Sequence, residues 1–382
     1  MQNFSFYNPV QIEFGKDKEN HIGEYLAKFG VKKVLLMYGS ERIKKDGLFD
    51  KVVASLAKNG VEFVQCGGVV SNPVLSKVYE AINLAKSSNV GGVLAVGGGS
   101  VLDSSKTIAA GARYDGDVWD FFIGKASPKD ALPLFDIITL AATGSEMNDG
   151  AVVTNEQTKQ KYAFSSPLVF PKVSVINPEL MKSISKDYLV YSASDIIAHS
   201  IEGYFTASSH PELISKYIEA NITTIIKTTE ILLKNPDDYE ARAEFAWAAT
   251  NALNGTTYVG VENFSYPNHM IEHSISALYN VAHGAGLSVV MPAWMQWYKS
   301  KNEARFSRFA KEIFGKNSAD EGIKALKDWF EKIGTPTKLR DFNLNKSSIN
   351  EITKVALEHA KAFGLADIYT KEVLEEILNL AY

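Results

Sequence analysis

The chain has 382 residues, of which 46% are hydrophobic and 22% are charged, and its formal net charge is -4. These values are typical of a globular protein of two or three domains, and they give no sign of the basic face that a nucleic-acid-binding protein needs. The single cysteine, Cys66, excludes an intrachain disulfide and a cysteine-based zinc cluster. Because we find neither a secretory signal pattern nor an apolar run of about 18 residues, we expect a cytoplasmic protein that does not span a membrane.

The first half of the chain alternates short apolar runs with helical patterns. We predict strands over residues 34–38, 61–64, 90–96 and 135–139, with helices between them, for example over 50–58 and 74–86. The strands lead into turns rich in glycine or hydroxyl residues. Strand, glycine-rich turn and helix in repetition predict a parallel sheet with helices on its faces. Sheets of this kind bind ligands at the carboxyl ends of their strands.

The pattern changes near residue 187, after which we predict helices throughout. Their expected ranges are 187–204, 214–234, 238–254, 301–314, 318–333, 347–362 and 371–380, in addition to a histidine-rich stretch. The chain is therefore predicted to belong to the α/β class, with a parallel-sheet domain over 1–186 followed by an all-helical domain over 187–382. A cleft between two such domains is the natural place for a site.

One glycine-rich turn, from Gly97 to Asp103, reads Gly-Gly-Gly-Ser-Val-Leu-Asp and joins a predicted strand to a predicted helix. Such a turn lets the backbone approach a phosphate, which the helix N-terminus then binds through its free N–H groups. A Walker A loop would need glycine at positions 100 and 105, and both are serine. A Rossmann fingerprint would need glycine or alanine at position 102, which is leucine. A dinucleotide is favoured over a nucleoside triphosphate, with a plain structural turn as the alternative.

The end of the first strong α/β strand bears on which dinucleotide is bound. An acidic residue there would bind the ribose 2′-hydroxyl and repel a 2′-phosphate. Gly39 leaves the space open and Ser40 can donate a hydrogen bond, which favours NADP, whereas Glu41 favours NAD.

The histidine-rich stretch runs from His269 to His283. His269 and His273 are four residues apart and share one face of a helix. His283 would lie about 21 Å from His269 on one straight helix, so the chain must turn if all three serve one site. We predict that the helix stops at Asn280 and that the glycines at 284 and 286 supply backbone freedom.

Asp195 and His199 form a second pair at this spacing, beside apolar residues. A lone carboxylate there would be costly. Together with His269 and His283 the pair makes a set of one carboxylate and three imidazoles, which suits Fe²⁺ or Zn²⁺ better than Mg²⁺ or Ca²⁺. The alternative is a hydrogen-bonded pair that only orders the helix. A second pair and a cofactor loop in the same chain favour the metal site.

These motifs resemble those of the iron-containing (group III) alcohol dehydrogenase family, most closely its NAD(P)H-dependent butanol dehydrogenase and aldehyde reductase branch. The resemblance is carried by the Gly97 to Asp103 turn, the Ala142 to Glu146 loop, Asp195-x3-His199, His269-x3-His273 and His283, and it runs end to end. It implies a dinucleotide-binding domain followed by a metal-binding domain, a homodimer, and a small primary alcohol or aldehyde such as butanol or butyraldehyde as substrate.

The resemblance also implies roles for individual residues. The metal ligands would be Asp195, His199, His269 and His283, and His273 would lie near the nicotinamide and the substrate. The residues expected to contact the dinucleotide are Gly39, Ser40, Asn72, Gly98, Gly99, Ser100, Asp103, Thr139, Thr143, Asn148 and Lys161. Within that set Lys161 matches a ribose contact and Asn72 a contact near the adenosine end.

One departure from the family pattern concerns the cofactor. The branch carries three glycines and a serine where this chain has Gly39-Ser40-Glu41-Arg42, and the NAD-selecting aspartate of other members is also absent. The sequence therefore leans weakly toward NADP and allows NAD.

In the expected mechanism a metal polarises the substrate oxygen and hydride passes to or from nicotinamide. His273 relays a proton or packs as a neutral residue. Four aromatic residues are candidates for an apolar pocket or for core packing: Tyr258, Phe264, Trp294 and Trp297.

Two other functions compete with this reading. A metal-dependent lyase or synthase of the dehydroquinate-synthase-like superfamily acts on polyanions and should place several lysines and arginines beside the metal. None lies between His269 and His283. A non-enzymatic, metal-stabilised binding module leaves the glycine-rich turn unexplained.

Overall fold

The computed structural model describes residues 1–382, which divide into two compact units. The sheet unit contains Tyr7–Thr158 and Tyr162–Ser183. The helical unit contains Met1–Phe6, Lys159–Lys161 and Ile184–Tyr382. The tripeptide at 159–161 thus belongs with helices that follow it in sequence, and this brings Lys161 to the site described below.

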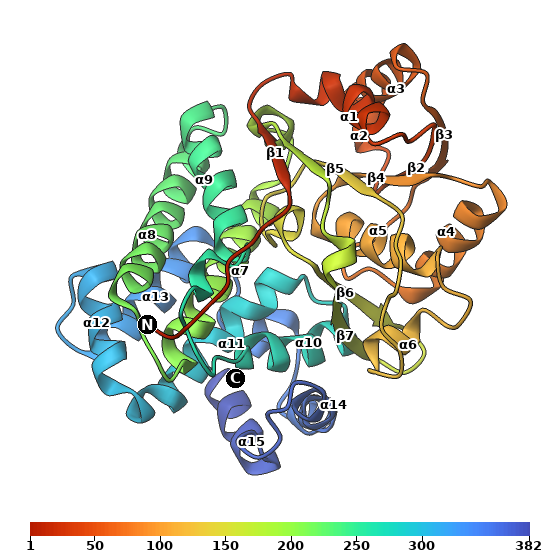
Figure 1. Cartoon of the computed structure of the whole chain (residues 1–382). Helices are drawn as coiled ribbons and strands as arrows, with labels where there is room; N and C mark the ends of the chain where they lie inside the picture. The colour runs from red at the N-terminus through yellow and green to blue at the C-terminus, as the bar shows by residue number, and fades with distance from the viewer. The chain divides into compact units, whose positions relative to one another are not determined.

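The sheet unit is built on a six-stranded parallel sheet with strand order β1-β8-β5-β4-β2-β3 (Figure 1). A separate two-stranded sheet pairs β6 with β7. The strands are β1 Gln11–Phe14, β2 Lys33–Tyr38, β3 Glu62–Cys66, β4 Gly92–Gly97, β5 Leu134–Ile138, β6 Gly150–Asn155, β7 Gln160–Ser165 and β8 Val173–Ile176. The predicted parallel sheet is confirmed, and β2 to β5 are its predicted strands.

The sheet unit contains six α-helices. They are α1 Ile22–Lys28, α2 Arg42–Lys45, α3 Leu48–Lys58, α4 Leu75–Ser87, α5 Gly99–Gly111 and α6 Trp119–Phe122. Of these, α3 and α4 confirm the two predicted ranges and α5 follows the glycine-rich turn as expected. Ile22 and Leu26 of α1 and Val52 and Leu56 of α3 lie in one core cluster with apolar side chains of the sheet, such as Leu36. Burial of this apolar surface is the main force that holds the layers together.

Four strands were not predicted, namely β1, β6, β7 and β8. The four residues of β8 are all buried, but the run is too short to be recognised by periodicity. Strand β7 reads Gln-Lys-Tyr-Ala-Phe-Ser, with a lysine at a position whose side chain is buried. Because of that lysine, the sequence of β7 lacks the apolar run that would predict a buried strand.

The helical unit confirms the prediction of helices throughout. They are α7 Lys186–Thr206, α8 Glu212–Lys234, α9 Tyr239–Ala252, α10 Pro267–Tyr279, α11 His283–Tyr298, α12 Glu303–Phe314, α13 Ala319–Ile333, α14 Ser348–Ala362 and α15 Lys371–Leu380. Helix α11 packs against α7 and α10 (Figure 1), and most residues of all three are buried. None of the helices in the chain is both long enough and apolar enough to cross a membrane.

The predicted turn between the histidines is present. Helix α10 ends at Tyr279, Asn280 takes a left-handed conformation with φ 51°, and α11 begins at His283. Asparagine is one of the few residues that adopt this conformation readily.

The expectation for the two glycines after His283 was wrong, because both lie inside α11 and provide close approach instead of backbone freedom. A Cβ atom at Gly284 would lie 2.0 Å from the backbone oxygen of Tyr191 in α7. A Cβ atom at Gly286 would lie 2.7 Å from the side chain of Glu272 in α10.

Candidate functional site

The predicted cofactor turns lie at one edge of the sheet. Strands β2, β4 and β5 are neighbours, and the register pairs Tyr38 with Val96 and Gly97 with Ile138. Because the strands are parallel, the residues that follow them emerge at the same edge. Gly39 and Ser40 follow β2, Gly98 follows β4 and Thr139 follows β5. The structure therefore brings together segments that are 100 residues apart in the sequence.

Glycine is required at the start of α5. Gly98 is the N-cap of this helix, and a Cβ atom at Gly99 would lie 2.5 Å from Thr143. The first turn of the helix, with Gly99 and Ser100, offers backbone N–H groups that have no partner within the helix. This arrangement suits an anionic group such as a pyrophosphate.

Two predicted cofactor residues use their side chains to build the adjoining loop. Asp103 accepts hydrogen bonds from Ser145 Oγ at 2.7 Å and from the backbone N–H of Val152 at 3.0 Å. Asn148 Oδ1 accepts one from Lys106 Nζ at 2.9 Å. Burial lowers the pKa of Lys106 to about 8. Asp103 and Asn148 thus shape the loop, and a direct contact of either with a dinucleotide stays a prediction.

The segment after β2, where a ribose contact is predicted, contains one charge pair and two side-chain hydrogen bonds. Glu41 contacts Lys44 Nζ at 2.9 Å, and the hydroxyl of Tyr38 lies 3.4 Å from its carboxylate. The hydrogen bond from Lys44 keeps the pKa of Glu41 below its usual value. Arg42 donates to Thr139 Oγ1 at 3.4 Å. Asn72, in the segment between β3 and α4, adopts a left-handed conformation with φ 52°.

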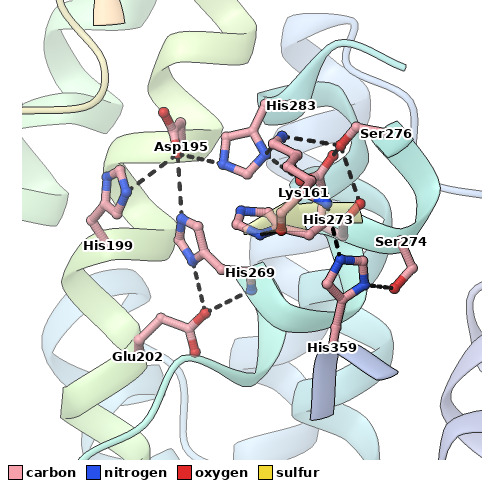
Figure 2. A network of polar contacts seen from close by, with 11 residues as sticks. Lys161, Asp195, His199, Glu202, His269, His273, Ser274, Ser276, His283 and His359 are labelled. Atoms are coloured by element: carbon pink, nitrogen blue, oxygen red, sulfur yellow. Dashed lines mark hydrogen bonds and ion pairs between the residues drawn. The ribbon is translucent and has the colours of Figure 1, made fainter. Parts of the chain in front are cut away.

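The helical unit gathers the predicted metal ligands around one carboxylate (Figure 2). Asp195 and His199 come from α7, His269 from α10 and His283 from the first position of α11. The Nε2 atoms of the three histidines each lie 3.6 Å from Asp195 Oδ1. Asp195, His199 and His269 are buried and His283 is partly exposed. All four predicted ligands therefore converge.

These distances fit a bound ion better than direct hydrogen bonds. A nitrogen and an oxygen bound tetrahedrally to one ion at usual bond lengths lie about 3.3–3.5 Å apart, close to the observed 3.6 Å. Asp195 Oδ1 and His269 Nε2 are both buried and have no hydrogen-bond partner. Buried polar atoms without partners are rare and costly, and an ion bound between them would supply the missing contacts.

Two further carboxylates contact the Nδ1 atoms of His269 and His283, on the side of each ring opposite Nε2. Glu202 Oε1 accepts from the backbone N–H of His269 at 3.1 Å and lies 2.9 Å from His269 Nδ1. Glu272 Oε2 makes a short contact with His283 Nδ1. Such contacts leave the Nε2 lone pairs free to bind an ion. Glu272, His273 and His283 also cluster closely enough to suggest an ion site, but the Glu272–His283 contact is a hydrogen bond with no room for an ion between its atoms.

The carboxylates beside His269 favour positive charge at that histidine, whereas burial keeps His199 neutral. Burial alone would lower the pKa of His269, yet the carboxylates of Asp195 and Glu202 raise it to about 9. Burial lowers the pKa of His199 to about 3. Burial also raises the pKa of Asp195, but the neighbouring histidines outweigh this effect and hold it below its usual value. A proton on His269 or a metal ion can supply the balancing charge.

Lys161 lies behind the cluster, where its ammonium group is almost fully buried. Its Nζ lies 3.2 Å from Ser276 Oγ, 3.3 Å from His283 Nδ1 and 3.7 Å from Glu272 Oε2 (Figure 2). The backbone N–H of Lys161 donates to His359 Nε2 at 3.3 Å. The expected contact of Lys161 with a ribose stays a prediction, since its ammonium group contacts Ser276, His283 and Glu272 in this structure.

His273 lies one turn after His269 on the same face of α10. Its Nδ1 lies 3.2 Å from the backbone oxygen of Lys161, and because that oxygen only accepts, Nδ1 carries the hydrogen and Nε2 keeps its lone pair. Burial, together with the charge of Lys161, holds the pKa of His273 well below its usual value. His273 is therefore neutral.

A cavity of about 390 Å³ lies in the helical unit next to this cluster. Two of its lining residues touch the histidines: the ring centroids of Tyr266 and His269 are 5.8 Å apart, as are those of Phe363 and His273. Of the four aromatic residues considered for a pocket, Phe264 lines this cavity, whereas Trp294 is a core residue that donates to the Tyr369 hydroxyl.

Sequence reasoning missed Glu202, Glu272, Lys161 in its place beside the metal cluster, and His359. Glu202 follows Asp195 and His199 at the spacing i, i+4, i+7 on an apolar helix, and Glu272 lies within the His269 motif. Both signals could have been used. Lys161 lies 198 residues from His359 and 122 residues from His283, and no local pattern connects them. The segment 269–283 contains no lysine or arginine, but the fold places Lys161 beside His283.

The sequence profile of the family described as iron-containing alcohol dehydrogenase matches residues 9–178. The profile of the C-terminal domain of the Fe-containing alcohol dehydrogenase family matches residues 189–382. Together they span both units.

Individual relatives match along their whole length. A probable NADH-dependent butanol dehydrogenase 1 of Bacillus subtilis is 39% identical, with 99% of each chain covered. The NADPH-dependent aldehyde reductase YqhD of Escherichia coli is 33% identical, with 94% of each chain covered. The crystal structure of NADH-dependent butanol dehydrogenase A from Thermotoga maritima superposes with a TM-score of 0.97 and 47% identity, covering 100% of this chain and 99% of that one.

Proposed function

The chain belongs to the iron-containing alcohol dehydrogenase family and is an NAD(P)-dependent enzyme that interconverts alcohols and aldehydes, and from this premise we propose its metal site, its cofactor and its substrate. The predicted ligands Asp195, His199, His269 and His283 hold one divalent ion, Fe²⁺ or Zn²⁺. The observation that carries this proposal is the equal 3.6 Å separation of three Nε2 atoms from Asp195 Oδ1. The unpartnered state of Asp195 Oδ1 and His269 Nε2 supports it.

The buried charges support a divalent ion. The region contains three buried carboxylates, those of Asp195, Glu202 and Glu272, and one buried ammonium group, that of Lys161. The carboxylates therefore carry two negative charges more than the ammonium group balances. An ion of charge two with neutral imidazole ligands balances them. When bound, such an ion polarises the substrate oxygen as a Lewis acid.

His273 is proposed to contact the substrate. Its Nδ1–H is directed to the Lys161 carbonyl, so the ring orientation is fixed and Nε2 is an acceptor. In the oxidation direction Nε2 can accept a hydrogen bond from the alcohol hydroxyl and so orient it. Because the ring is buried and neutral, we assign it this orienting role in place of the proton relay expected from the sequence.

The dinucleotide is proposed to bind at the sheet edge formed by the turns after β2, β4 and β5, with its pyrophosphate at the N-terminus of α5. Hydride transfer is then the chemistry of the nicotinamide itself. We propose NADH as the preferred form, against the weak lean of the sequence toward NADP. Glu41 keeps its charge where a 2′-phosphate would lie, and the more similar relatives include enzymes named as NADH-dependent.

The substrate is proposed to be a short- to medium-chain primary aldehyde or its alcohol, such as butyraldehyde or butanol. The cavity beside His269 and His273 is lined by aromatic and aliphatic side chains with a few neutral polar ones and no charged one. An apolar chain of several carbons fits such a lining, and a polyanionic sugar does not.

Multi-turnover kinetics with NADH and NADPH across a short aldehyde series test this function. We expect net consumption of NADH in proportion to the aldehyde reduced. Product formation without net consumption of dinucleotide would favour the lyase or synthase alternative. Metal-dependent stability without any turnover would favour a binding module.

We also propose a homodimer in the cytoplasm, as the family resemblance implies. Light scattering coupled to size-exclusion chromatography tests the first point and fractionation of cells tests the second.

A further inference from the structure

Two of the proposed metal ligands are each backed by a carboxylate, but the two carboxylates have different neighbours. Glu202, which holds His269, receives its other hydrogen bond from the neutral amide Asn268 Nδ2 at 3.1 Å. Glu272, which holds His283, lies 3.7 Å from the ammonium group of Lys161. The same ammonium group lies 3.3 Å from His283 Nδ1.

The two neighbours of His283 Nδ1 require opposite protonation of that atom. A carboxylate can only accept, so Glu272 requires a hydrogen on Nδ1. An ammonium group can only donate, so Lys161 requires a lone pair there. A neutral imidazole carries one ring hydrogen, and its position decides which nitrogen can bind a metal. Only the form favoured by Glu272 leaves the lone pair on Nε2, which faces Asp195.

We propose that Glu272 is a positioning residue that keeps His283 in its metal-binding tautomer by accepting the Nδ1 hydrogen in competition with the ammonium group of Lys161. This inference rests on the metal site proposed above. In it Lys161 is the competing donor beside His283 Nδ1. Glu272 holds the Nδ1 hydrogen through its shorter contact with that atom, and its negative charge also balances the ammonium group of Lys161.

The local structure is arranged around this carboxylate. Ser276 Oγ donates to Glu272 Oε1 in a short contact and lies 3.2 Å from Lys161 Nζ. Gly286 leaves the space that the carboxylate occupies, because a Cβ atom there would lie 2.7 Å from Glu272 Oε1. The Glu272 side chain is fully buried and that of Lys161 is 4% exposed, so water cannot replace either partner.

The Glu272→Gln substitution tests the idea because it removes the charge with little change of shape. Lys161 then loses its counterion and donates to His283 Nδ1, which moves the ring hydrogen to Nε2. We expect metal affinity to fall about 10- to 100-fold, the range found when groups that orient ligands are altered. Lys161→Met alone should not weaken binding. Lys161→Met combined with Glu272→Gln should regain most of the loss, since the competing donor is gone.

Glu202→Gln is the matched control, because the carboxylate at 202 has no ammonium group in contact with its histidine in the structure. Its effect on metal affinity should be additive with that of Lys161→Met, whereas the effects of Glu272→Gln and Lys161→Met should be strongly non-additive.

The measurement is Zn²⁺ affinity of the full chain by competition with a chromophoric chelator, supported by the visible absorption of bound Co²⁺. Circular dichroism of each metal-free variant checks folding, and Lys161→Gln replaces Lys161→Met if the latter does not fold. Weakened binding by Glu272→Gln that is restored in the double variant, with a Co²⁺ spectrum returning to that of the wild type, supports the proposal.

Wild-type affinity in Glu272→Gln would overturn the proposal, as would a double variant as weak as Glu272→Gln alone. The proposal would also be overturned if the effects of Glu202→Gln and Lys161→Met on metal affinity were as non-additive as those of Glu272→Gln and Lys161→Met. A wild-type chain that binds no metal would instead contradict the proposed function, so the two failures can be told apart.

Discussion

At the scale of single residues, Glu41 is the side chain expected to select the cofactor. It is exposed at the end of β2 and keeps its negative charge through Lys44. We expect Glu41→Ser to raise kcat/KM for NADPH relative to NADH roughly 10-fold, since a like charge near a 2′-phosphate is removed. Glu62→Ser, at the opposite end of β3, is the control. An unchanged cofactor ratio in Glu41→Ser would contradict this assignment.

A substitution at His273 can distinguish contact with the substrate from a packing role. His273→Phe keeps an aromatic ring in the buried position and removes the Nε2 acceptor. We expect kcat for alcohol oxidation to fall roughly 100-fold because the substrate hydroxyl is no longer oriented, while metal content and thermal stability change little. His210→Phe, at a half-buried histidine between α7 and α8 that is not among the proposed ligands, is the control. If His273→Phe retains wild-type kcat, the histidine only packs.

At the scale of elements, strands β5 and β8 are joined by a buried acid. Ser174 Oγ of β8 lies 2.6 Å from Asp136 Oδ2 of β5 and 2.7 Å from the backbone oxygen of Glu146. That oxygen only accepts, so the single hydroxyl hydrogen goes to it and Asp136 must supply the hydrogen of the other contact. Burial raises the pKa of Asp136 well above its usual value, in agreement with a protonated carboxyl.

This arrangement predicts a pH dependence of stability. The folded chain keeps the Asp136 proton at pH values where the unfolded chain has lost it, so the free energy of unfolding falls as pH rises above about 4. The slope from this group is about 1.4 kcal/mol per pH unit until the folded-state pKa is reached. Asp136→Asn, whose amide can donate to Ser174, should remove this contribution. Chemical denaturation of both chains from pH 4 to 8 measures it, and parallel curves would refute the protonated state.

Elements buried on both sides were the easiest to predict. Strands β2, β4 and β5 are almost wholly buried in a parallel sheet, so their sequences are continuous apolar runs. Strand β7 carries Lys161 at a buried position and gives no such run. The buried ammonium group of Lys161 is stabilised by contacts with Glu272 and Ser276, which lie more than 100 residues away in the sequence. Tertiary contacts of this kind leave no local pattern.

The ligand set could be predicted because each pair lies at helical spacing on an apolar helix. The turn at Asn280 that brings His283 to His269 was also predictable, since asparagine tolerates a left-handed conformation. The roles of Glu202 and Glu272 were not predicted, because an acidic residue in a helix is far more often exposed than buried. The reason for glycine at 284 and 286 depends on the approach of Tyr191 and Glu272, which only the structure reveals.

At the scale of the whole molecule, each unit carries one part of the chemistry. The sheet unit presents glycine and hydroxyl turns at one edge of a parallel sheet. The helical unit holds a carboxylate and three imidazoles, and the buried atoms Asp195 Oδ1 and His269 Nε2 lack hydrogen-bond partners. The family match spans both units, and this combination of features is what an alcohol dehydrogenase that uses a metal and a dinucleotide requires.

The central claim is that one divalent ion, held by Asp195, His199, His269 and His283, is needed for turnover. The most direct measurement strips the purified chain of metal and titrates it anaerobically with Fe²⁺, and separately with Zn²⁺, while following NADH-dependent reduction of butyraldehyde. Activity should be lost on stripping and should rise linearly to a plateau at one ion per chain with at least one of the two metals. Full activity in the stripped chain, with no response to either metal, would contradict the account.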